Sequence, residues 1–259
     1  MKTKGDSFYI YGKKPVEEQL LRNPENVMRI FISDKMAAKD GGFLELRAFA
    51  KENKIPTNPV TKRKLQDYVG DVNDQGVVAL IRRPEYVEFD DWMENIDLDS
   101  MPCVLVLDHI EDTHNFGAIL RTAAAVGVSG VIVSKDRQAP VNGTVYKTSA
   151  GALIHVPIVR VANINQTIKR LQDNKFWVSA IDMDEEAKHP LTVWSQKFDS
   201  PTVIVMGGEG KGVSEKTKEH ADFIVSIPME NGVESLNVSV AAAVVLYEWK
   251  RQMQLFINN

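Results

Sequence analysis

The sequence contains a single cysteine, Cys103, among 259 residues, so it offers no internal disulfide and no cysteine cluster for a metal ion. Long apolar runs are also missing. The longest, from Val238 to Tyr247, is far shorter than the roughly 20 residues of a membrane-spanning helix. No apolar signal core follows Met1, and we therefore expect a cytoplasmic protein. The five histidines show no clustered spacing, so we expect no metal site.

An overall basic charge is missing too, since the formal net charge is −4. The charges are unevenly distributed along the chain. Residues 1–83 hold 16 Lys and Arg against 11 Asp and Glu, whereas residues 84–102 hold seven acidic residues and no basic one. Binding of phosphate groups depends on a local basic patch rather than on the overall charge. The composition is therefore compatible with nucleic-acid binding by residues 1–83.

The same patterns divide the chain into three regions. Residues 1–83 alternate short apolar strands with helices, which predicts a small α/β domain. Residues 84–102 carry two prolines and the acidic run, which indicates a linker. Phe89 and Trp92 within it predict that one side packs against the protein. In the first region we expect strands at 8–11, 27–32 and 76–81 and helices at 15–21, 43–52 and 62–68.

Residues 103–259 form the second domain and show a repeated strand–helix pattern. This alternation predicts a parallel sheet with helices on both faces, and hence an α/β fold. The expected strands are 104–107, 130–134, 176–181, 202–206 and 223–227. The expected helices are 116–126, 164–173, 213–219 and 236–252.

Three polar segments follow apolar strands in the second domain. Asn115 and Arg121 come after the first strand, and a glycine-rich run occupies residues 207–212. The segment 227–239 places Ser235, Leu236 and Asn237 in the first turn of the last helix. Glycine lets a ligand approach the backbone closely, and a helix N-terminus carries free N–H groups that bind acceptor atoms. The glycine run is neither a Rossmann fingerprint nor a P-loop, because Val213 stands where the P-loop lysine would be. Each segment alone also fits a tight turn or a capped core helix.

Taken together, in this order and spacing, the three segments resemble the SpoU (TrmH-like) branch of the SPOUT RNA methyltransferases. Within that branch the chain looks most like the bacterial enzymes that methylate the ribose 2′-hydroxyl of a guanosine in 23S ribosomal RNA. Residues 74–79 close an N-terminal domain like the one these enzymes carry. The resemblance implies an N-terminal RNA-binding domain with a ribosomal-protein-like fold and a C-terminal domain knotted in a trefoil. Pattern reasoning by itself reaches only a doubly wound sheet, because threaded chains are rare.

The resemblance also implies S-adenosyl-L-methionine as the methyl donor, with no metal. It places the adenine, ribose and methionine parts against the backbone around Gly207, Gly208, Ile227, Met229 and Leu236. Backbone contacts of this kind put little constraint on side chains, so ordinary residues can serve. We expect that replacing Gly207 by Val fills the cofactor space and abolishes binding without unfolding the protein.

For catalysis the resemblance implies that Arg121, with Asn115 in the same motif, lies beside the target phosphate and hydroxyl. A guanidinium stays protonated, so stabilising a developing alkoxide suits Arg121 better than acting as a base. Glu209 is a chemically easier base, or it orients Arg121 through a bidentate pair. Ser235 and Asn237 match residues at the mouth of the active site. Asn237 would hold the target ribose or Glu209, and Ser235 would cap the last helix and touch the substrate.

Other readings remain open at this point. The small-residue stretch 148–152 fits close helix packing as well as substrate contact. An RNA-binding protein of the same fold without catalysis is disfavoured, because Arg121, Glu209, Ser235 and Asn237 are all present. A nucleotide-binding oxidoreductase would need its glycine fingerprint after the first strand of the domain, whereas here the glycine run comes near the end. Transfer RNA is an alternative substrate to ribosomal RNA.

The last helix carries an apolar stripe that core packing or a second protein surface could cover. The resemblance implies a homodimer formed through the C-terminal domain, with the active site near the interface. A two-fold pair would place this stripe against its own copy. The residues of the stripe are Leu236, Val240, Ala243, Val244, Tyr247 and Met253.

Overall fold

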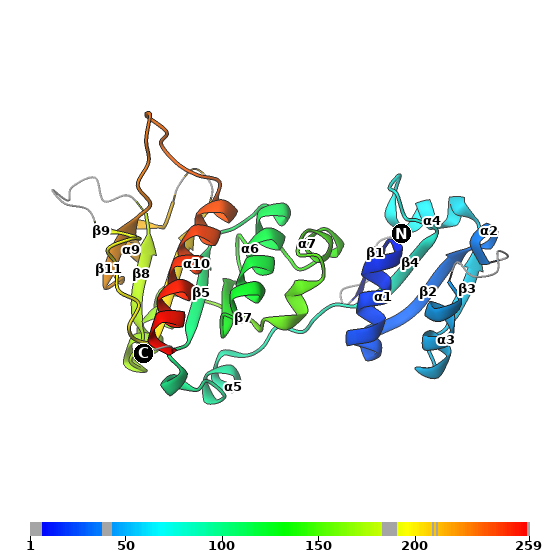
Figure 1. Ribbon diagram of the computed structural model, residues 1–259, viewed down its shortest axis with the longest axis horizontal. Coiled ribbons are helices and arrows are strands. Elements are labelled where there is room, and N and C mark those ends of the chain that lie inside the picture. Colours follow the sequence, from blue (N-terminus) through cyan, green and yellow to red (C-terminus); the bar gives the residue numbers. More distant parts are fainter. Residues whose placement is uncertain (1–6, 38–42, 183–190, 209, 211, 258–259) are drawn as a thin grey trace. The chain divides into compact units, whose positions relative to one another are not determined.

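The computed structural model of the chain describes residues 7–37, 43–182, 191–208, 210 and 212–257. It divides into two compact units, Met1–Pro84 with Val141–Gly151, and Glu85–Pro140 with Ala152–Asn259 (Figure 1). Both units combine helices with a β-sheet, so the predicted α/β class is confirmed.

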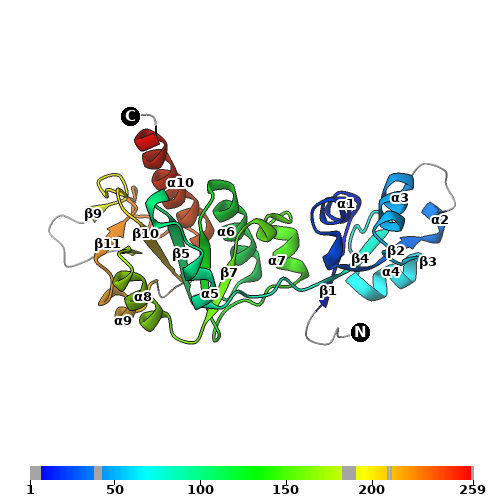
Figure 2. The same ribbon diagram turned by 90° about the horizontal axis from the view of Figure 1, so that it is seen from below.

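The first unit contains a four-stranded sheet in the order β1-β4-β2-β3. β1 and β2 are antiparallel to β4, and β3 is parallel to β2. Helix α4 contacts β1, β2 and β4, while α1 and α3 contact each other on the other side of the sheet (Figure 2). The strands are β1 (Ser7–Tyr11), β2 (Val27–Ser33), β3 (Thr57–Val60) and β4 (Val77–Arg82). The helices are α1 (Lys13–Arg22), α2 (Asp34–Ala37), α3 (Leu44–Glu52) and α4 (Lys62–Val69).

The predicted strands and helices of this region are present with boundaries shifted by a few residues, but β3 was not predicted. Its sequence, Thr-Asn-Pro-Val, has no apolar alternation, and Pro59 lacks a backbone donor. Such a strand is tolerated at the edge of a sheet, where β3 lies. Its partner β2 defines it rather than its own residues.

The short helix α7 (Gly143–Thr148) belongs to the first unit although it is far away in sequence. The hydroxyl of Tyr146 donates to Oε1 of Gln19 in α1 at 2.7 Å, and both side chains are buried. Burial raises the pKa of Tyr146 above its ordinary value, which keeps this donor protonated. Nζ of Lys147 also donates to the Tyr11 hydroxyl at 2.8 Å. These two bonds explain why Val141–Gly151 groups with the first unit.

The second unit contains a seven-stranded sheet in the order β7-β6-β5-β10-β8-β11-β9, in which every neighbouring pair is parallel. The strands are β5 (Cys103–Asp108), β6 (Gly130–Ser134), β7 (Ile158–Val161), β8 (Trp177–Ile181), β9 (Leu191–Thr192), β10 (Thr202–Gly207) and β11 (Phe223–Ser226). The helices are α5 (Phe89–Glu94), α6 (Thr113–Val126), α8 (Ile164–Asp173), α9 (Glu215–Lys218) and α10 (Val238–Ile257). The predicted parallel sheet is confirmed.

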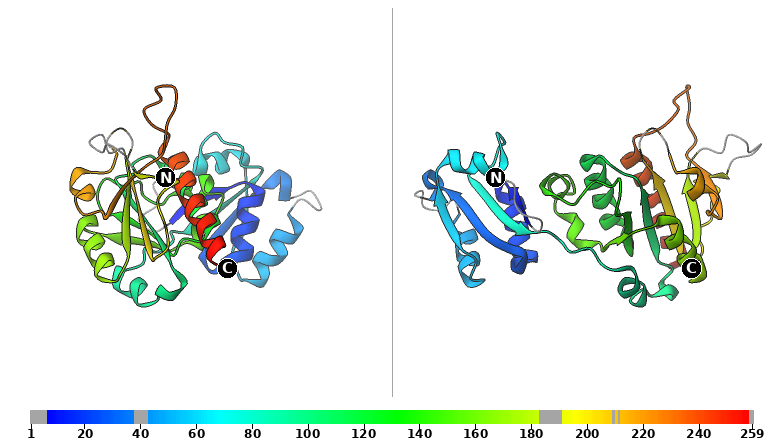
Figure 3. Two further views of the ribbon diagram at one scale, coloured as in Figure 1. Left: turned by 60° about the vertical axis from the view of Figure 1, so that its left-hand side comes forward. Right: turned by 180° about the vertical axis from the view of Figure 1, so that it is seen from behind.

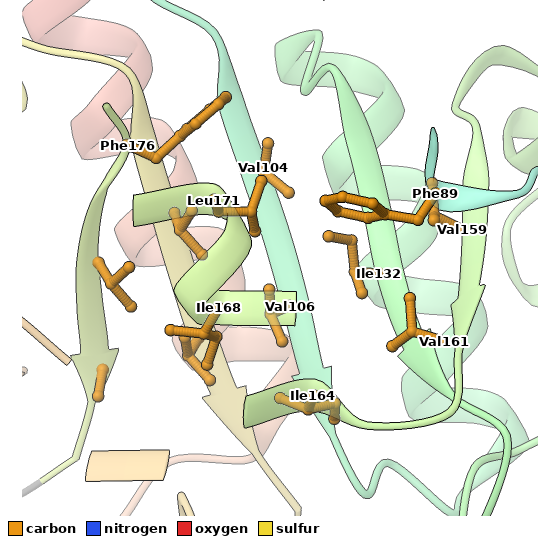
Figure 4. Packing of buried hydrophobic residues seen from close by; sticks show 14 of the residues in the cluster. Phe89, Val104, Val106, Ile132, Val159, Val161, Ile164, Ile168, Leu171 and Phe176 are labelled. Carbon is orange, nitrogen blue, oxygen red and sulfur yellow. The ribbon is translucent and has the colours of Figure 1, made fainter. Parts of the chain in front are cut away.

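The helices cover both faces of this sheet, which explains why its strands are apolar on both sides. α6 and α10 pack together on one face (Figure 2), while α5 and α8 cover the other. Val104 and Val106 of β5 point to the α8 side, where Ile168 and Leu171 of α8 meet them (Figure 4). Cys103 is fully buried, and burial raises the pKa of its thiol, so it is a core residue.

The acidic segment after Pro84 packs onto the second sheet from Glu85 onward. Phe89 and Trp92 of α5 are buried, so the prediction that one side of this segment packs against the protein is confirmed. Nε1 of Trp92 donates to the Ser129 carbonyl at 3.0 Å. The indole lies so close to Gly130 that a Cβ there would be 2.7 Å from Nε1. The acidic side chains face water while the aromatic ones complete the core.

Candidate functional site

The three predicted segments lie at one edge of the second sheet. β5, β10 and β11 run in the same direction, so their last residues, Asp108, Gly207 and Ser226, lie at the same edge. Asp108 and Gly207 are direct register partners, and β8 separates β10 from β11. Open α/β sheets bind ligands at the carboxyl ends of their strands. This edge is therefore the candidate site.

Asn115 and Asn237 are brought together across 122 positions of sequence. Nδ2 of Asn237 donates to Oδ1 of Asn115 at 3.0 Å. Asn115 is fixed in the first turn of α6, because its N–H donates to the capping carboxylate of Asp112 at 2.7 Å. The structure thus joins the first and third predicted motifs by a direct side-chain bond.

Asn237 also determines where α10 begins. Its Oδ1 accepts from the N–H of Ser239 at 2.9 Å and its carbonyl accepts from Val240 and Ala241, which is the bonding of a helix cap. α10 therefore starts at Val238, so the predictions that Ser235 and Leu236 lie in its first turn and that Ser235 caps it are wrong. The cap makes the helix begin two residues later than its apolar pattern predicts.

The loop between β11 and α10 runs from Ile227 to Asn237 without regular structure and projects beyond the strand ends (Figure 3). Its tip is a tight turn, in which Asn231 and Gly232 have positive φ and Val233 N–H donates to the Glu230 carbonyl. In the same loop Ser235 is exposed and Leu236 is half-buried.

Arg121 lies on α6, six residues after Asn115, which corresponds to about 9 Å along the helix axis. Its side chain is exposed and makes no hydrogen bond or ion pair with any residue that the structure describes. Among the described site residues, Asn115 and Asn237 are thus hydrogen-bonded to each other, and Arg121 is hydrogen-bonded to neither. Glu209, the predicted base, lies outside the described residues.

The glycine run packs backbone against backbone. A Cβ on Gly207 would lie 1.9 Å from the carbonyl carbon of Gly212 and 2.1 Å from N of Val213. A Cβ on Gly208 would lie 2.3 Å from the His109 carbonyl oxygen. Gly208 and Gly212 also form an antiparallel bridge. These two glycines are required by chain packing, so the expectation that Gly207→Val leaves the fold intact is wrong.

Two carboxylates hold the residues that follow the glycine run, and we did not single out either as a site residue. Asp108 is buried, and its Oδ2 accepts from Ser214 N–H at 3.2 Å and from the Thr217 hydroxyl at 3.1 Å. Oδ2 of Asp182 accepts from Val213 N–H at 3.1 Å. A signal was present in the sequence, because each acid directly follows or ends an apolar strand.

Lys218 of α9 adds charge to this arrangement. Its Nζ lies 2.6 Å from Oε1 of Glu215 and 3.7 Å from Oδ2 of Asp182. The hydrogen bond to Glu215 and the nearby Asp182 carboxylate raise the pKa of Lys218. The ammonium group therefore stays charged and helps to hold α9 near the end of β8.

Residues 7–37, 43–182, 191–208, 210 and 212–257 contain no group of three His, Cys, Asp or Glu side chains placed to hold a metal ion. No helix within these residues is long and apolar enough to cross a membrane.

Two protein-family models match the chain. The SpoU rRNA Methylase family matches residues 102–247, which include all three motifs. The substrate-binding domain of RNA 2′-O ribose methyltransferases matches residues 9–87, most of the first unit. A relative from Staphylococcus saprophyticus, whose name assigns it to the TrmH family of tRNA/rRNA methyltransferases, is 39% identical over 94% of this chain and 95% of its own length.

Solved structures share the fold of this chain. An rRNA methyltransferase from Sinorhizobium meliloti has a TM-score of 0.77 at 22% identity, covering 95% of this chain and 87% of its own. The SpoU methyltransferase AviRb from Streptomyces viridochromogenes, in complex with the cofactor AdoMet, has a TM-score of 0.75 at 23% identity, covering 96% and 91%. At these identities the likeness shows the fold.

Proposed function

Because the chain belongs to the SpoU/TrmH family of RNA 2′-O-ribose methyltransferases, we propose that it methylates the ribose 2′-hydroxyl of a guanosine in 23S ribosomal RNA. As a member of this family it uses S-adenosyl-L-methionine as methyl donor and acts on ribosomal or transfer RNA. The Asn115–Asn237 bond supports the proposal, since it joins the first and third motifs at the edge where open α/β sheets generally bind ligands.

The loop after β11 fits a cofactor that is held by backbone groups. Ile227, Met229 and Leu236 are half-buried, and their N–H and C=O groups bond to no other backbone group in the described part of the chain. Half-buried aliphatic side chains with free peptide groups suit an adenine ring, which is flat, apolar on its faces and polar at its edge. When bound, S-adenosylmethionine supplies an electrophilic methyl group.

Arg121 supplies positive charge beside the target in this proposal. Its guanidinium is exposed and unpaired among the described residues, so it is available to clamp the RNA phosphate and to stabilise charge on the 2′-oxygen. Glu209 accepts the proton of the hydroxyl, or orients Arg121. Asn115 and Asn237 hold each other in place and present their remaining amide groups toward the substrate. Ser235, on the exposed loop, contacts the RNA.

We also propose that the protein is a homodimer formed through α10. Val240 is 49% exposed and Tyr247 is 57% exposed, with half-buried Val244 between them on the same helix face. Val245, Leu246 and Trp249 on the opposite face are buried in the protein's own core. Met253 is also buried in that core, so its predicted place in the exposed stripe is wrong.

The proposal is tested by mapping 2′-O-methyl groups in ribosomal and transfer RNA from cells with and without the gene. One guanosine of 23S ribosomal RNA should lose its methyl group on deletion and regain it with the wild-type gene but not with the Arg121→Ala variant. The purified protein should also transfer labelled methyl to that RNA.

The same map separates the alternatives. If only a transfer RNA loses a methyl group on deletion, then transfer RNA and not ribosomal RNA is the substrate. Unchanged methylation in every RNA, with no transfer by the purified protein, would contradict catalysis and favour a protein that only binds RNA.

A further inference from the structure

A cavity of about 430 Å³ lies at the opposite end of the second sheet from the candidate site. It is lined by Trp177, Thr202 and Phe223, the first residues of β8, β10 and β11, and by part of the segment 191–200. Thr202 precedes Gly207 by five residues on β10, roughly 17 Å along the strand, and Ser179 is in register with Ile204, roughly 10 Å before Gly207. No residue that lines the cavity belongs to the proposed cofactor site.

Aromatic rings form one side of the cavity. The rings of Trp177 and Phe223 are stacked, with centroids 5.7 Å apart and planes inclined by 29°. Trp177 is nevertheless 51% exposed, so Phe223 covers only part of the indole. A partly uncovered indole next to a cavity suits a second flat ring, since offset stacking is the preferred geometry of aromatic groups.

A buried hydroxyl without a partner also lines the cavity. Ser179 is 1% exposed, and its Oγ has no hydrogen-bond partner. Ser179 lies two residues after Trp177 on β8, so both side chains point to the same face of the sheet. A buried hydroxyl that stays unpaired destabilises the protein, so its presence beside a cavity points to a ligand that completes its bonding.

The wall opposite the sheet is held in place by α10. Gln252 accepts from Phe198 N–H at 2.9 Å through Oε1 and donates to the Gln196 carbonyl at 2.9 Å through Nε2. Lys197, between Gln196 and Phe198 in the sequence, and Asp199, directly after Phe198, line the cavity with opposite charges. Neither makes an ion pair with any residue in the described ranges. The cavity thus offers a cationic donor and an anionic acceptor at a fixed wall.

From this geometry we propose that the cavity binds a nucleobase. The base stacks on Trp177 and its polar edge bonds to Ser179 Oγ and Asp199, while Lys197 meets an attached phosphate. The volume falls in the range of pockets for small ligands. Since the protein acts on RNA, we assign the base to an unpaired nucleotide of the RNA substrate. This last step rests on the RNA specificity of the family, whereas the base site itself does not.

The first test is calorimetric titration with guanosine 5′-monophosphate, after saturation with S-adenosylhomocysteine so that the cofactor site is filled. Trp177→Ala should weaken binding roughly 5-fold or more, the effect of losing one stacked base. Ser179→Ala should weaken binding with an unchanged or higher melting temperature, because it removes an unpaired buried hydroxyl. Trp194→Ala is the matched control, since Trp194 is 58% exposed and does not line the cavity.

The second test repeats the titration with a short single-stranded RNA that carries one 4-thiouridine for crosslinking. Weaker binding of both probes by Trp177→Ala, with a crosslink to the 177 region, assigns the base to RNA. An effect on the mononucleotide alone leaves a nucleobase site that takes a free nucleotide.

Equal affinities of Trp177→Ala and wild type for both probes would overturn the proposal. A particle mass lower for Trp177→Ala than for the wild type would also overturn it, because this would show that a second copy of the chain, and not a nucleobase, covers the cavity. Methyl transfer to RNA is measured separately, so a failure of the proposed function would not be mistaken for a failure of this site.

Discussion

Asn237 has two tasks at the start of α10, and substitution can separate them. It caps the helix through Oδ1, and it donates to Asn115 through Nδ2. Ser is as good a cap as Asn, so Asn237→Ser should keep the stability and lose only the bond to Asn115. Asn237→Ala should lose both, with about 0.5–2 kcal/mol of unfolding free energy. Urea unfolding and a methylation assay measure the two effects, and equal destabilisation by Ser and Ala would contradict the capping role.

Arg121 is exposed and unpaired in the described structure, which suits a group that meets its partner only in the RNA complex. Arg121→Ala should lower methyl transfer by at least about a hundredfold, the usual effect of removing one stabilising donor. Arg121→Lys should recover little if two parallel hydrogen bonds are needed, because an ammonium is a point charge.

Affinity for S-adenosylhomocysteine should stay near the wild-type value in both Arg121 variants, because the proposed cofactor site is built from loops that do not include Arg121. Calorimetry measures this affinity in the absence of RNA. Lys169→Ala is the control, since Lys169 is exposed on α8 on the opposite face of the sheet. Wild-type turnover by Arg121→Ala would remove the catalytic assignment.

At the level of elements, the glycine run is a packing junction as well as a candidate ligand loop. Gly207→Ala places a Cβ about 2 Å from the backbone of Gly212 and Val213, which cannot rotate away as a side chain would. We expect it to cost about 3 kcal/mol of unfolding free energy or more. Gly210→Ala meets nothing within 4 Å and should cost only the strain of its φ of 78°, about 1–2 kcal/mol. Urea unfolding compares the two, and a costlier Gly210→Ala would refute the packing explanation.

The end of α10 carries a pH-dependent element. The hydrogen bond from the Arg251 guanidinium, with a further one from Gln252, lowers the pKa of Glu248 below its ordinary value of 4.5. A carboxyl group whose pKa is lower in the folded state than in the unfolded state stabilises the fold at pH values above its unfolded-state pKa. This stabilisation is lost as the pH falls through the folded-state pKa. Glu248→Gln should therefore flatten the dependence of unfolding free energy on pH below about pH 5.

Urea unfolding at several pH values measures this effect, and Glu219→Gln on the exposed surface is the control. An unchanged dependence in Glu248→Gln would show that the Arg251 and Gln252 bonds do not act on the stability.

At the level of the whole molecule, the exposed face of α10 predicts self-association. Wild-type protein at micromolar concentration should scatter light as a particle of twice the 29.0 kDa chain mass. Val240→Glu and Tyr247→Glu place a charge on the exposed stripe and should each give a single chain. Gln254→Glu, exposed near the end of the same helix, should leave the pair intact. A wild-type particle of one chain mass with full activity would remove the dimer and the shared site.

The sequence predicted the secondary structure well where local rules are sufficient. The apolar runs of β5, β6 and β10 and the periodic helices α6 and α8 are found within a few residues of the predicted positions. β3 and α7 were missed because their residues lack a periodic pattern, and neighbouring chain segments determine them instead. Trefoil threading stays a prediction from resemblance, since neither periodicity nor strand order depends on it.

Local patterns in the sequence were enough to predict the α/β class, the parallel sheet and the placement of three polar segments after apolar strands, because these depend on periodicities and caps that span only a few residues. The folded chain was needed to show that Asn237 meets Asn115, that Gly207 packs on Gly212, and that Val141–Gly151 joins the first unit. It also placed Ser179 without a partner beside a cavity. The physical reason is that contacts between distant residues depend on strand register and side-chain volume throughout the core, which no local pattern encodes.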